Sequence, residues 1–512
     1  MSLPRAAVVV CVAAFALAPA VPAFGQDHGD HGAGGMTTAP NGWVQMPAEH
    51  LQSMIDAAPA RSIVSVPQAV YVGIVVVDAP LTLQGVGRPI LDGAGEGSVL
   101  TITAPDVVVA NLDIRGSGDG PVGSPSGVMI EGADRARVED VWISGSYIGI
   151  TVRASANVVI DGVRIEGPQE GAIEGETHAI STGDAEDGAH EQGLAAPPRT
   201  DLQLRGDGIW LWNAVDAVVR DSAIRNVRDG IYLSYGEGAL LEGNLIEHSR
   251  YAVHDMFATG LTIAGSTFRG NLSGCVLMYG GPVELRGNTI VESGSASTGF
   301  GVLVKDAGSV TLEGNVVADN RIGVHVDDAG RTGGDPTRLK ANTIAMNQIG
   351  VMLYPSTDAT FVANTFVENS TQVTLGGEGV TQAVWTVGGV GNYWSDYGGF
   401  DAAGDGTGDL AHTLSGRMSR LLAAEPLLLA LASGPAFRLL SAVDDRWSPA
   451  EPLVVDEAPL MESRAPALRG ARQGSSVRLW IPGLALTVSS AWLLVRARRR
   501  PDRSRRAEVA RG

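Results

Sequence analysis

Short apolar runs alternate with Gly, Asn and Ser along most of the chain. Between Gly230 and Arg250 the runs are Ile231–Leu233, Leu240–Leu241 and Leu245–Ile246. Strands this short do not build an ordinary sandwich, but they suit a coil of three strands per circuit, in which each strand pairs with its equivalent one circuit above. The pattern therefore predicts rungs, each rung being one circuit with three short sides and three corners.

A Gly-(Ile/Val) pair marks each unit and recurs mostly at a spacing of 22 residues. The marker positions, with Ala and Cys as single replacements, are Gly127, Gly149, Gly208, Gly230, Ala252-Val253, Gly274-Cys275, Gly301, Gly323 and Gly350. A fixed period of this size is typical of a solenoid. The sequence therefore predicts an all-β fold, a right-handed, single-stranded parallel β-helix over residues 61–400, with Cys275 buried as an inward structural thiol.

Asparagines are expected at one corner of the coil. Gly-Asn or Ala-Asn pairs precede a strand at Asn244, Asn288, Asn315, Asn342 and Asn364. Asn tolerates the left-handed conformation that a sharp corner requires. Stacked Asn side chains can also form hydrogen bonds along the corner, so a structural role is expected for them.

Breaks in the period predict insertions. Two steps of 27 residues carry five extra residues each, at 293–299 and 327–336, and both are expected to leave the coil at one corner. Between Gly149 and Gly208, 59 residues replace an expected 44. The segment 166–205 there is acidic, rich in Gly and Ala and without period, which predicts a mobile flap.

The two ends of the chain predict a periplasmic protein that is anchored in the inner membrane by a C-terminal helix. Residues 1–25 have the pattern of a secretion signal. The range 477–496 includes an uncharged apolar stretch long enough to span a membrane, and the Arg-rich range 497–512 after it is expected in the cytoplasm. Residues 26–60 and 401–476 are expected to be a His- and Met-containing segment and a C-terminal cap with linker.

Charge follows this division. The formal charge of the chain is −19, the signal carries one positive charge and residues 496–512 carry six, which leaves about −26 on residues 26–495. Such a surface repels nucleic acid and anionic glycans and attracts cations.

The first candidate metal site is the mature N-terminus. His28, His31, Met36 and His50 lie there, together with Met46 and Met54. Imidazole suits copper, and thioether sulfur selects Cu(I). A solvated linker with accidental His and Met is the alternative.

The second candidate metal site lies in the repeats. His254, Met256 and Met278 occupy nearly equivalent positions of neighbouring units, which stack ~4.8 Å apart, so a copper site is possible. Ordinary packing is the alternative, because Met commonly fills apolar gaps.

Two further sets of residues carry weaker signals. Trp210, Trp212, Arg228, Asp229, Tyr232 and Tyr235 form an aromatic and charged face, but no paired carboxylates for glycoside chemistry are identified. Asp401, Asp405 and Asp409 resemble a Ca²⁺ loop. Ala403 and His412 stand where an EF-type loop needs oxygen ligands, which favours a turn that caps the end of the coil.

Several motifs together resemble the NosD family of periplasmic β-helix proteins. They are the repeats with RDGIYL, the segment RYAVHDM, the later VLMY and above all GNYWSDYGGFDAAGDGTGD, within roughly residues 60–440. The resemblance implies a non-catalytic role in the maturation of nitrous oxide reductase, a copper enzyme. It also implies an ABC-type permease with its ATPase and a copper chaperone as partners.

The expected function is thus copper and/or sulfur delivery to the copper–sulfur centre of that reductase. Two other functions remain open because a fold does not define a function. A secreted polysaccharide lyase or epimerase would show an Asp cluster beside an Arg or Lys base on one face. A carbohydrate-binding repeat protein would bind glycans without needing a permease.

Overall fold

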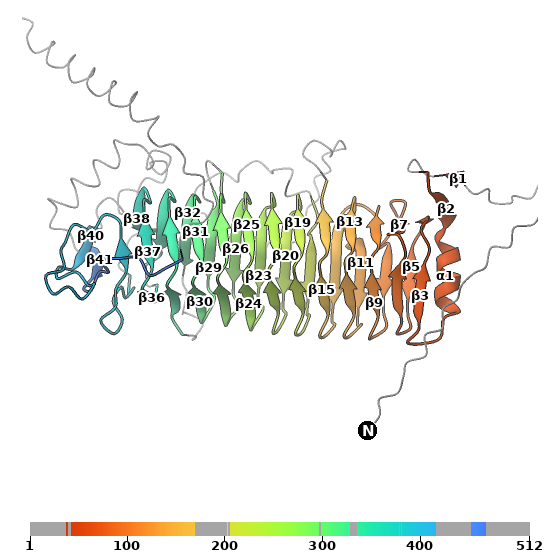
Figure 1. Ribbon diagram of the computed structural model, residues 1–512, viewed down its shortest axis with the longest axis horizontal. Coiled ribbons are helices and arrows are strands. Elements are labelled where there is room, and N and C mark those ends of the chain that lie inside the picture. The colour runs from red at the N-terminus through yellow and green to blue at the C-terminus, as the bar shows by residue number, and fades with distance from the viewer. Residues whose placement is uncertain are drawn as a thin grey trace, which may run out of the picture.

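The computed structural model is a long rod of stacked rungs (Figure 1). It describes residues 37–38, 42–168, 202, 205–295, 298–327, 335–355, 357–377, 379, 381–415 and 452–466. The predicted signal, the ranges 477–496 and 497–512, and most of the predicted flap lie outside these residues. Within the described part of the chain, no helix has the length and apolar character needed to cross a membrane.

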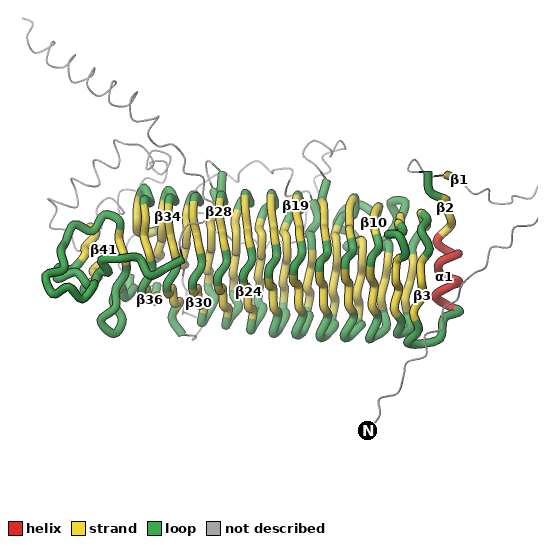
Figure 2. Tube along the Cα trace, viewed as in Figure 1, coloured by secondary structure: helices red, strands yellow, loops and turns green. Residues whose placement is uncertain are grey.

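Three parallel sheets run the length of the rod, and each rung adds one strand to each sheet (Figure 2). Sheet A consists of β1 (Thr37–Thr38), β2 (Val44–Pro47), β4 (Val70–Val72), β7 (Ile90–Asp92), β10 (Asp113–Arg115), β13 (Trp142–Ser144), β16 (Arg164–Glu166), β19 (Ala223–Arg225), β22 (Leu245–Glu247), β25 (Thr267–Arg269), β28 (Thr289–Val291), β31 (Val316–Ala318), β34 (Thr343–Ala345), β37 (Thr365–Val367) and β39 (Tyr393–Trp394). Its pairing is parallel except for the terminal β1–β2 pair.

The other two sheets repeat the same order. Sheet B consists of β3 (Ile63–Val66), β6 (Thr82–Gly85), β9 (Val108–Ala110), β12 (Arg137–Glu139), β15 (Val159–Asp161), β18 (Val218–Arg220), β21 (Leu240–Glu242), β24 (Leu261–Ala264), β27 (Val283–Arg286), β30 (Val310–Glu313), β33 (Thr337–Lys340) and β36 (Ala359–Val362). Sheet C consists of β5 (Val75–Val77), β8 (Leu100–Ile102), β11 (Ser126–Glu131), β14 (Ile148–Arg153), β17 (Ile209–Trp212), β20 (Asp229–Ser234), β23 (Tyr251–Met256), β26 (Ser273–Met278), β29 (Phe300–Lys305), β32 (Ile322–Asp327), β35 (Ile349–Leu353) and β38 (Thr371–Leu375). The predicted three-sided parallel β-helix is confirmed.

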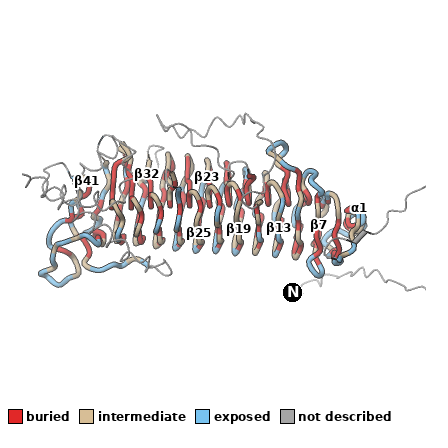
Figure 3. Tube along the Cα trace, turned by 90° about the horizontal axis from the view of Figure 1, so that it is seen from above, coloured by how far each residue is buried: buried red, intermediate tan, exposed pale blue. Residues whose placement is uncertain are grey.

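The Gly-(Ile/Val) markers lie in register along sheet C. Ile209, Ile231, Val253, Cys275 and Val302 are successive partners and are fully buried in the core. Figure 3 shows this buried interior along the rod. The predicted inward position of the Cys275 thiol is confirmed, and burial raises its pKa well above the ordinary value.

The marker glycine is required by close approach between rungs. A Cβ placed on Gly230 would lie 2.4 Å from Ile246 Cγ2 and 2.6 Å from the Ala252 carbonyl oxygen. At Gly230, as at most other marker glycines, a core side chain of sheet A fills this space, whereas corner asparagines Asn347 and Asn369 fill it at Gly323 and Gly350. A Cβ would clash at these marker positions, which explains why glycine recurs there.

The asparagine corner is confirmed as a hydrogen-bonded ladder, but the assignment of the left-handed residue was wrong. Each backbone N–H of Asn288, Asn315 and Asn342 donates to the side-chain oxygen of the Asn one rung later, at 2.9–3.0 Å. The positive φ belongs to the preceding residue, for example 66° at Gly314 and 52° at Ala341. The Asn itself supplies the ladder that joins the rungs.

A second ladder occupies the corner between sheets A and C. It contains Asn320, whose N–H donates to Asn347 Oδ1, and Asn347, whose N–H donates to Asn369 Oδ1. These asparagines do not follow Gly or Ala in the sequence, so the Gly-Asn motif did not identify them.

The register corrects two predictions about the insertions. Ile150 pairs directly with Ile209, so the 59-residue step replaces one 22-residue rung and not two. The insertions also do not share one corner. Residues 293–299 lie between β28 of sheet A and β29 of sheet C, whereas 327–336 lie between β32 of sheet C and β33 of sheet B.

Both ends of the rod are covered. At the N-terminal end, α1 (Ala48–Asp56) lies over the first rungs with Leu51 and Ile55 buried (Figure 1). At the C-terminal end, β40 (His412–Ser415) and β41 (Pro452–Asp456) form an antiparallel pair. Asp456, fully buried, accepts hydrogen bonds from the Asn392 N–H and Trp394 Nε1, at 2.7 and 2.8 Å. It therefore closes the asparagine ladder where no further rung follows.

Candidate functional site on the outer face of sheet C

The outer face of sheet C carries two columns of side chains that point away from the core. Side chains alternate along a strand, so the residues next to each marker Ile/Val face outward. The central column contains Trp210, Tyr232, His254, Val276, Leu303, His325, Met352 and Thr374. The second column contains Trp212, Ser234, Met256, Met278, Lys305 and Asp327.

Part of the central column is buried although it faces outward. His254 is 3% exposed, His325 8% and Met352 8%. Neighbouring rings enclose these positions: Tyr232 stacks on His254 with ring centroids 4.8 Å apart, and Trp210 lies parallel to Tyr232 at 6.3 Å. The face thus offers enclosed, partly apolar surroundings to imidazole and thioether groups.

A charged network underlies the first part of this face. Arg228 makes two hydrogen bonds to Asp207, at 2.9 and 2.7 Å, and Arg250 makes two to Asp229, at 2.9 and 2.7 Å. His254 Nδ1 lies 3.0 Å from Asp229 Oδ2. Such two-point arginine–carboxylate pairs are geometrically specific, so they hold these side chains in place.

Asp229 is ionised in this network. Its burial opposes ionisation, but the positive charge of Arg250 and the hydrogen bonds from His254 and Arg250 outweigh burial and lower the pKa of Asp229. In the tautomer that carries its proton on Nδ1, His254 donates a hydrogen bond to this carboxylate, and the Nε2 lone pair is then directed away from Asp229. This carboxylate–histidine pairing is the arrangement that orients metal-binding histidines in proteins.

The structure brings His254, Met256 and Met278 to one face. His254 and Met256 are two residues apart on β23, and Met278 of β26 pairs with Met256 in register. The Tyr232 hydroxyl lies 3.6 Å from Met256 Sδ. The structure therefore places His254, Met256 and Met278 together on one face, as the sequence predicted. The sequence did not predict that Asp229, 25 positions before His254, contacts its ring.

A second histidine occupies the same column three rungs later. His325 pairs in register with Leu303 on one side and Met352 on the other. The Phe300 and Tyr354 rings lie 5.0 and 5.2 Å from its imidazole. Within the described residues, neither nitrogen of His325 has a hydrogen-bond partner.

The charged residues of the aromatic face predicted from the sequence form ion pairs. Arg228 and Asp229 each belong to a buried ion pair and are not free for acid–base chemistry. Trp212 and Tyr235 are exposed at the edge of the face. Tyr235 begins a stack with Phe257 and Tyr279, ring centroids 5.1 Å apart, along the corner after sheet C.

The acidic loop near the C-terminus uses its carboxylates on its own backbone. Asp401 accepts hydrogen bonds from the N–H groups of Gly404 and Gly406, at 2.6 and 2.8 Å, and Asp405 accepts one from Thr407. These bonds, that of Gly406 first, lower the pKa of Asp401. The arrangement agrees with a capping turn. Nowhere in the described residues do three or more His, Cys, Asp or Glu side chains gather as for a metal ion.

The N-terminal candidates divide between described and undescribed residues. His28, His31 and Met36 lie outside the described residues. His50 is exposed on α1, while Met46 and Met54 are partly buried and pack against the core. The segment 42–56 is therefore an end cap as well as a candidate for metal binding.

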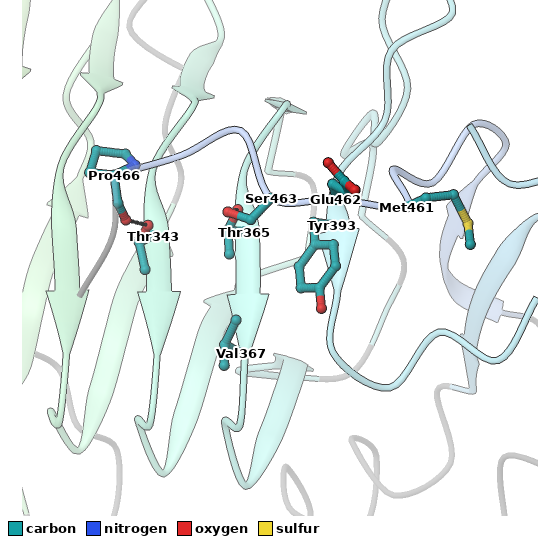
Figure 4. Close-up of a pocket in the computed structure, with 8 residues that line it drawn as sticks. All are labelled: Thr343, Thr365, Val367, Tyr393, Met461, Glu462, Ser463 and Pro466. Atoms are coloured by element: carbon teal, nitrogen blue, oxygen red, sulfur yellow. Dashed lines mark hydrogen bonds between the residues drawn. The ribbon is translucent and has the colours of Figure 1, made fainter. Parts of the chain in front are cut away.

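A strap after β41 returns along sheet A. Thr343 Oγ1 donates to the Pro466 carbonyl at 2.5 Å, and the Thr365 and Ser463 hydroxyls are 2.7 Å apart (Figure 4). The shallow groove between strap and sheet is lined also by Val367, Tyr393, Met461 and Glu462. Its polar groups join the strap to the rod, which indicates a structural role.

The fold and this face together define a capped β-solenoid with aromatic, His and Met side chains along the outside of sheet C. Comparison with known proteins agrees: the family described as "Periplasmic copper-binding protein (NosD)" matches residues 178–399. A Stutzerimonas stutzeri protein named "Probable ABC transporter binding protein NosD" is 30% identical over 409 residues, covering 77% of this chain and 86% of that protein. The chain belongs to the NosD family, and the resemblance seen in its motifs is confirmed.

Two further comparisons are consistent with this membership. A Pseudomonas aeruginosa protein of the same name is 28% identical over 410 residues, covering 78% of this chain and 87% of that protein. Among solved structures, a variant of the catalytic domain of a GH87 α-1,3-glucanase with bound nigerose superposes with a TM-score of 0.51, at 11% identity and 71% coverage of each chain. At that identity the likeness concerns the fold alone.

Proposed function

We propose that this protein is a non-catalytic maturation factor for nitrous oxide reductase, which helps to assemble the copper–sulfur centre by delivering copper and/or sulfur. The observation that carries the proposal is the cluster of His254, Met256 and Met278 on the outer face of a NosD-family rod. Imidazole and thioether ligands suit copper, and thioether selects Cu(I). Copper is cargo in this role, held for transfer.

The surroundings of His254 support a ligand role. Asp229 fixes Nδ1, so Nε2 is the nitrogen available to a metal, and Arg250 keeps Asp229 ionised. Met256 lies on the same strand and face, and Met278 follows on the next rung. His28, His31, Met36 and His50 remain a predicted second source of ligands at the N-terminus.

The proposal includes partners and a location. The relatives carry the name of an ABC transporter binding protein, and we propose an ABC-type permease with its ATPase, a copper chaperone and nitrous oxide reductase as partners. We place the rod in the periplasm, held at the inner membrane by residues 477–496. A negative surface of about −26 over residues 26–495 favours metal cations over nucleic acid.

The geometry of sheet C argues against a glycan-cleaving role. Such an enzyme needs two carboxylates able to act on one substrate, or a carboxylate cluster for Ca²⁺ beside a free base. Asp207 and Asp229 are instead bound by Arg228 and Arg250, and Asp255 faces the core. The charges of this face therefore hold side chains in place.

The proposal is tested with a deletion strain carrying variants of the gene. The double variant Met256→Leu/Met278→Leu keeps side-chain volume and removes both thioethers. We expect nitrous oxide reductase from this strain to contain less copper and to show weaker copper–sulfur absorption. Met129→Leu is the matched control, because Met129 lies between Thr101 and Thr151 on the outward side of sheet C, four rungs from His254 and outside every candidate metal site. A fully loaded reductase from the deletion strain itself would end the maturation proposal.

A further inference from the structure

His325 is a buried histidine that forms no hydrogen bond with any residue the structure describes. It is 8% exposed, and both ring nitrogens are buried and unpaired within the described residues. Leaving a buried polar group unpaired destabilises the folded state. Such a group in a native structure needs an explanation, for example an ion that binds it.

Apolar groups surround this imidazole. Phe300 and Tyr354 lie against the ring, with centroids 5.0 and 5.2 Å away. Met352, in register with His325 on the next rung, forms a small apolar cluster with Ile322 and Ile349, against which Phe300 packs. This cluster lies outside the main core, on the outer face of sheet C.

His325 is neutral in these surroundings. Burial, and secondarily the positive charge of Lys305, lower its pKa from 6.5 to about 3. The nearby carboxylate of Asp327 is 3.2 Å from Lys305 Nζ and forms an ion pair with it. One nitrogen of a neutral imidazole carries a lone pair, and no described residue forms a hydrogen bond with either ring nitrogen.

The second donor is the thioether of Met352. Cα partners of adjacent strands in a parallel sheet are ~4.8 Å apart, and both side chains point outward, so one ion can touch both. A neutral nitrogen and a thioether in apolar surroundings select Cu(I) over harder ions. No carboxylate or thiolate belongs to the set, which disfavours Zn²⁺ and Ca²⁺.

We propose that His325 and Met352 form a Cu(I) site, separate from the cluster around His254. The two positions are three rungs apart on one column, or roughly 14 Å at the ordinary strand spacing. The inference rests on the proposed function and extends it, because sheet C would then carry two copper sites along one column. Binding itself does not depend on that function.

The test is Cu(I) titration of the purified full chain against bicinchoninate, with wild type, His325→Leu and Met352→Leu. Leu replaces Met with little change of volume, and at position 325 it removes the unpaired nitrogens, so both variants are expected to fold. We expect each variant to lose one Cu(I) equivalent or to bind it at least tenfold more weakly. Circular dichroism and thermal unfolding confirm the fold.

Copper K-edge absorption separates the two sites. In Met256→Leu/Met278→Leu, sulfur scattering from bound Cu(I) is expected to persist, and it is expected to weaken further when Met352→Leu is added. Unchanged Cu(I) stoichiometry and affinity in both His325→Leu and Met352→Leu would overturn the site. That result would leave the maturation proposal intact, because reductase copper content in the deletion strain tests it independently.

Discussion

His254 and His325 occupy the same outward column of sheet C, but their surroundings are opposite. His254 Nδ1 is bound by Asp229, which two hydrogen bonds join to Arg250. His325 lies among Phe300, Tyr354 and Met352 without a hydrogen-bond partner in the described part of the chain. His254 is oriented by a charged carboxylate, whereas His325 is enclosed by apolar side chains, so one repeat position holds an imidazole in two different surroundings.

The difference has a physical consequence for metal exchange. The carboxylate of Asp229 behind His254 fixes the orientation of the ring and hence the direction of Nε2. The apolar enclosure of His325 keeps its ring neutral and favours a soft, singly charged ion. The comparison predicts that the network around Asp229 contributes to folding and orientation, while His325 is costly to the fold without metal.

The largest expected effect comes from removing the carboxylate. Asp229→Ala leaves Arg250 and His254 buried without their partner, and breaking such a pair destabilises a protein by ~3–5 kcal/mol. Urea unfolding at neutral pH measures the loss. Asp161→Ala is the control, because it removes the partner of Arg220 in a more exposed ion pair, and a much smaller loss is expected. Equal losses in both variants would mean that burial does not distinguish the two networks.

A second expected effect concerns the residue after His254. Asp255 faces the core in register with Leu233 and Leu277, and its Oδ2 has no partner among the described residues. Burial raises its pKa to about 7, although the Ala258 N–H hydrogen bond opposes this rise. The folded chain therefore holds a proton that the unfolded chain releases above its ordinary pKa of 3.8, and stability falls as pH rises from about 4 to 7.

Asp255→Leu is accordingly expected to stabilise the protein. The gain should be small near pH 4 and reach about 2–4 kcal/mol above pH 7, as measured by urea unfolding at the two pH values. Leu211→Asp is the reciprocal variant, since Leu211 lies in the same inward column. It should be destabilising at pH 8. A lower urea midpoint for Asp255→Leu at pH 8 would contradict the assignment of Asp255 as a destabilising core charge.

The repeat predicted the fold because each rung places one Ile or Val and one Gly at the same two positions of the coil. The repeat could not show which of two adjacent residues has a given role when both residue types are able to fill it. Gly314 and Asn315 both tolerate positive φ, so the pattern did not show that Gly adopts it and Asn forms the ladder. The step from Gly149 to Gly208 contains no marker, so only the register of Ile150 with Ile209 shows that it is one rung.

The site was predictable in part. His254, Met256 and Met278 follow from the period, because residues one period apart lie on adjacent rungs. Asp229 lies 25 residues before His254 and was predicted only as part of a carbohydrate-type face, since pairing across rungs with an offset of three is not visible in the repeat. The unpaired nitrogens of His325 depend on the side chains that enclose it, which no periodicity specifies.

The smallest expected effect is a change in the pH dependence of stability caused by His325. With a folded pKa of about 3 against an ordinary 6.5, the folded chain leaves His325 unprotonated where the unfolded chain binds a proton. Stability contributed by this group is full above pH 6.5 and falls by ~1.4 kcal/mol per pH unit down to about pH 3. The free energy of unfolding of the metal-free protein is measured with urea at pH 6.5 and at pH 5. The loss of stability caused by this decrease in pH should be about 2 kcal/mol smaller in His325→Leu than in wild type. Met352→Leu should keep the wild-type difference, because it leaves the buried imidazole of His325 in place. An equal pH dependence in wild type and His325→Leu would show that the pKa of His325 is the same in the folded and unfolded chains, and burial would then not affect this group as proposed.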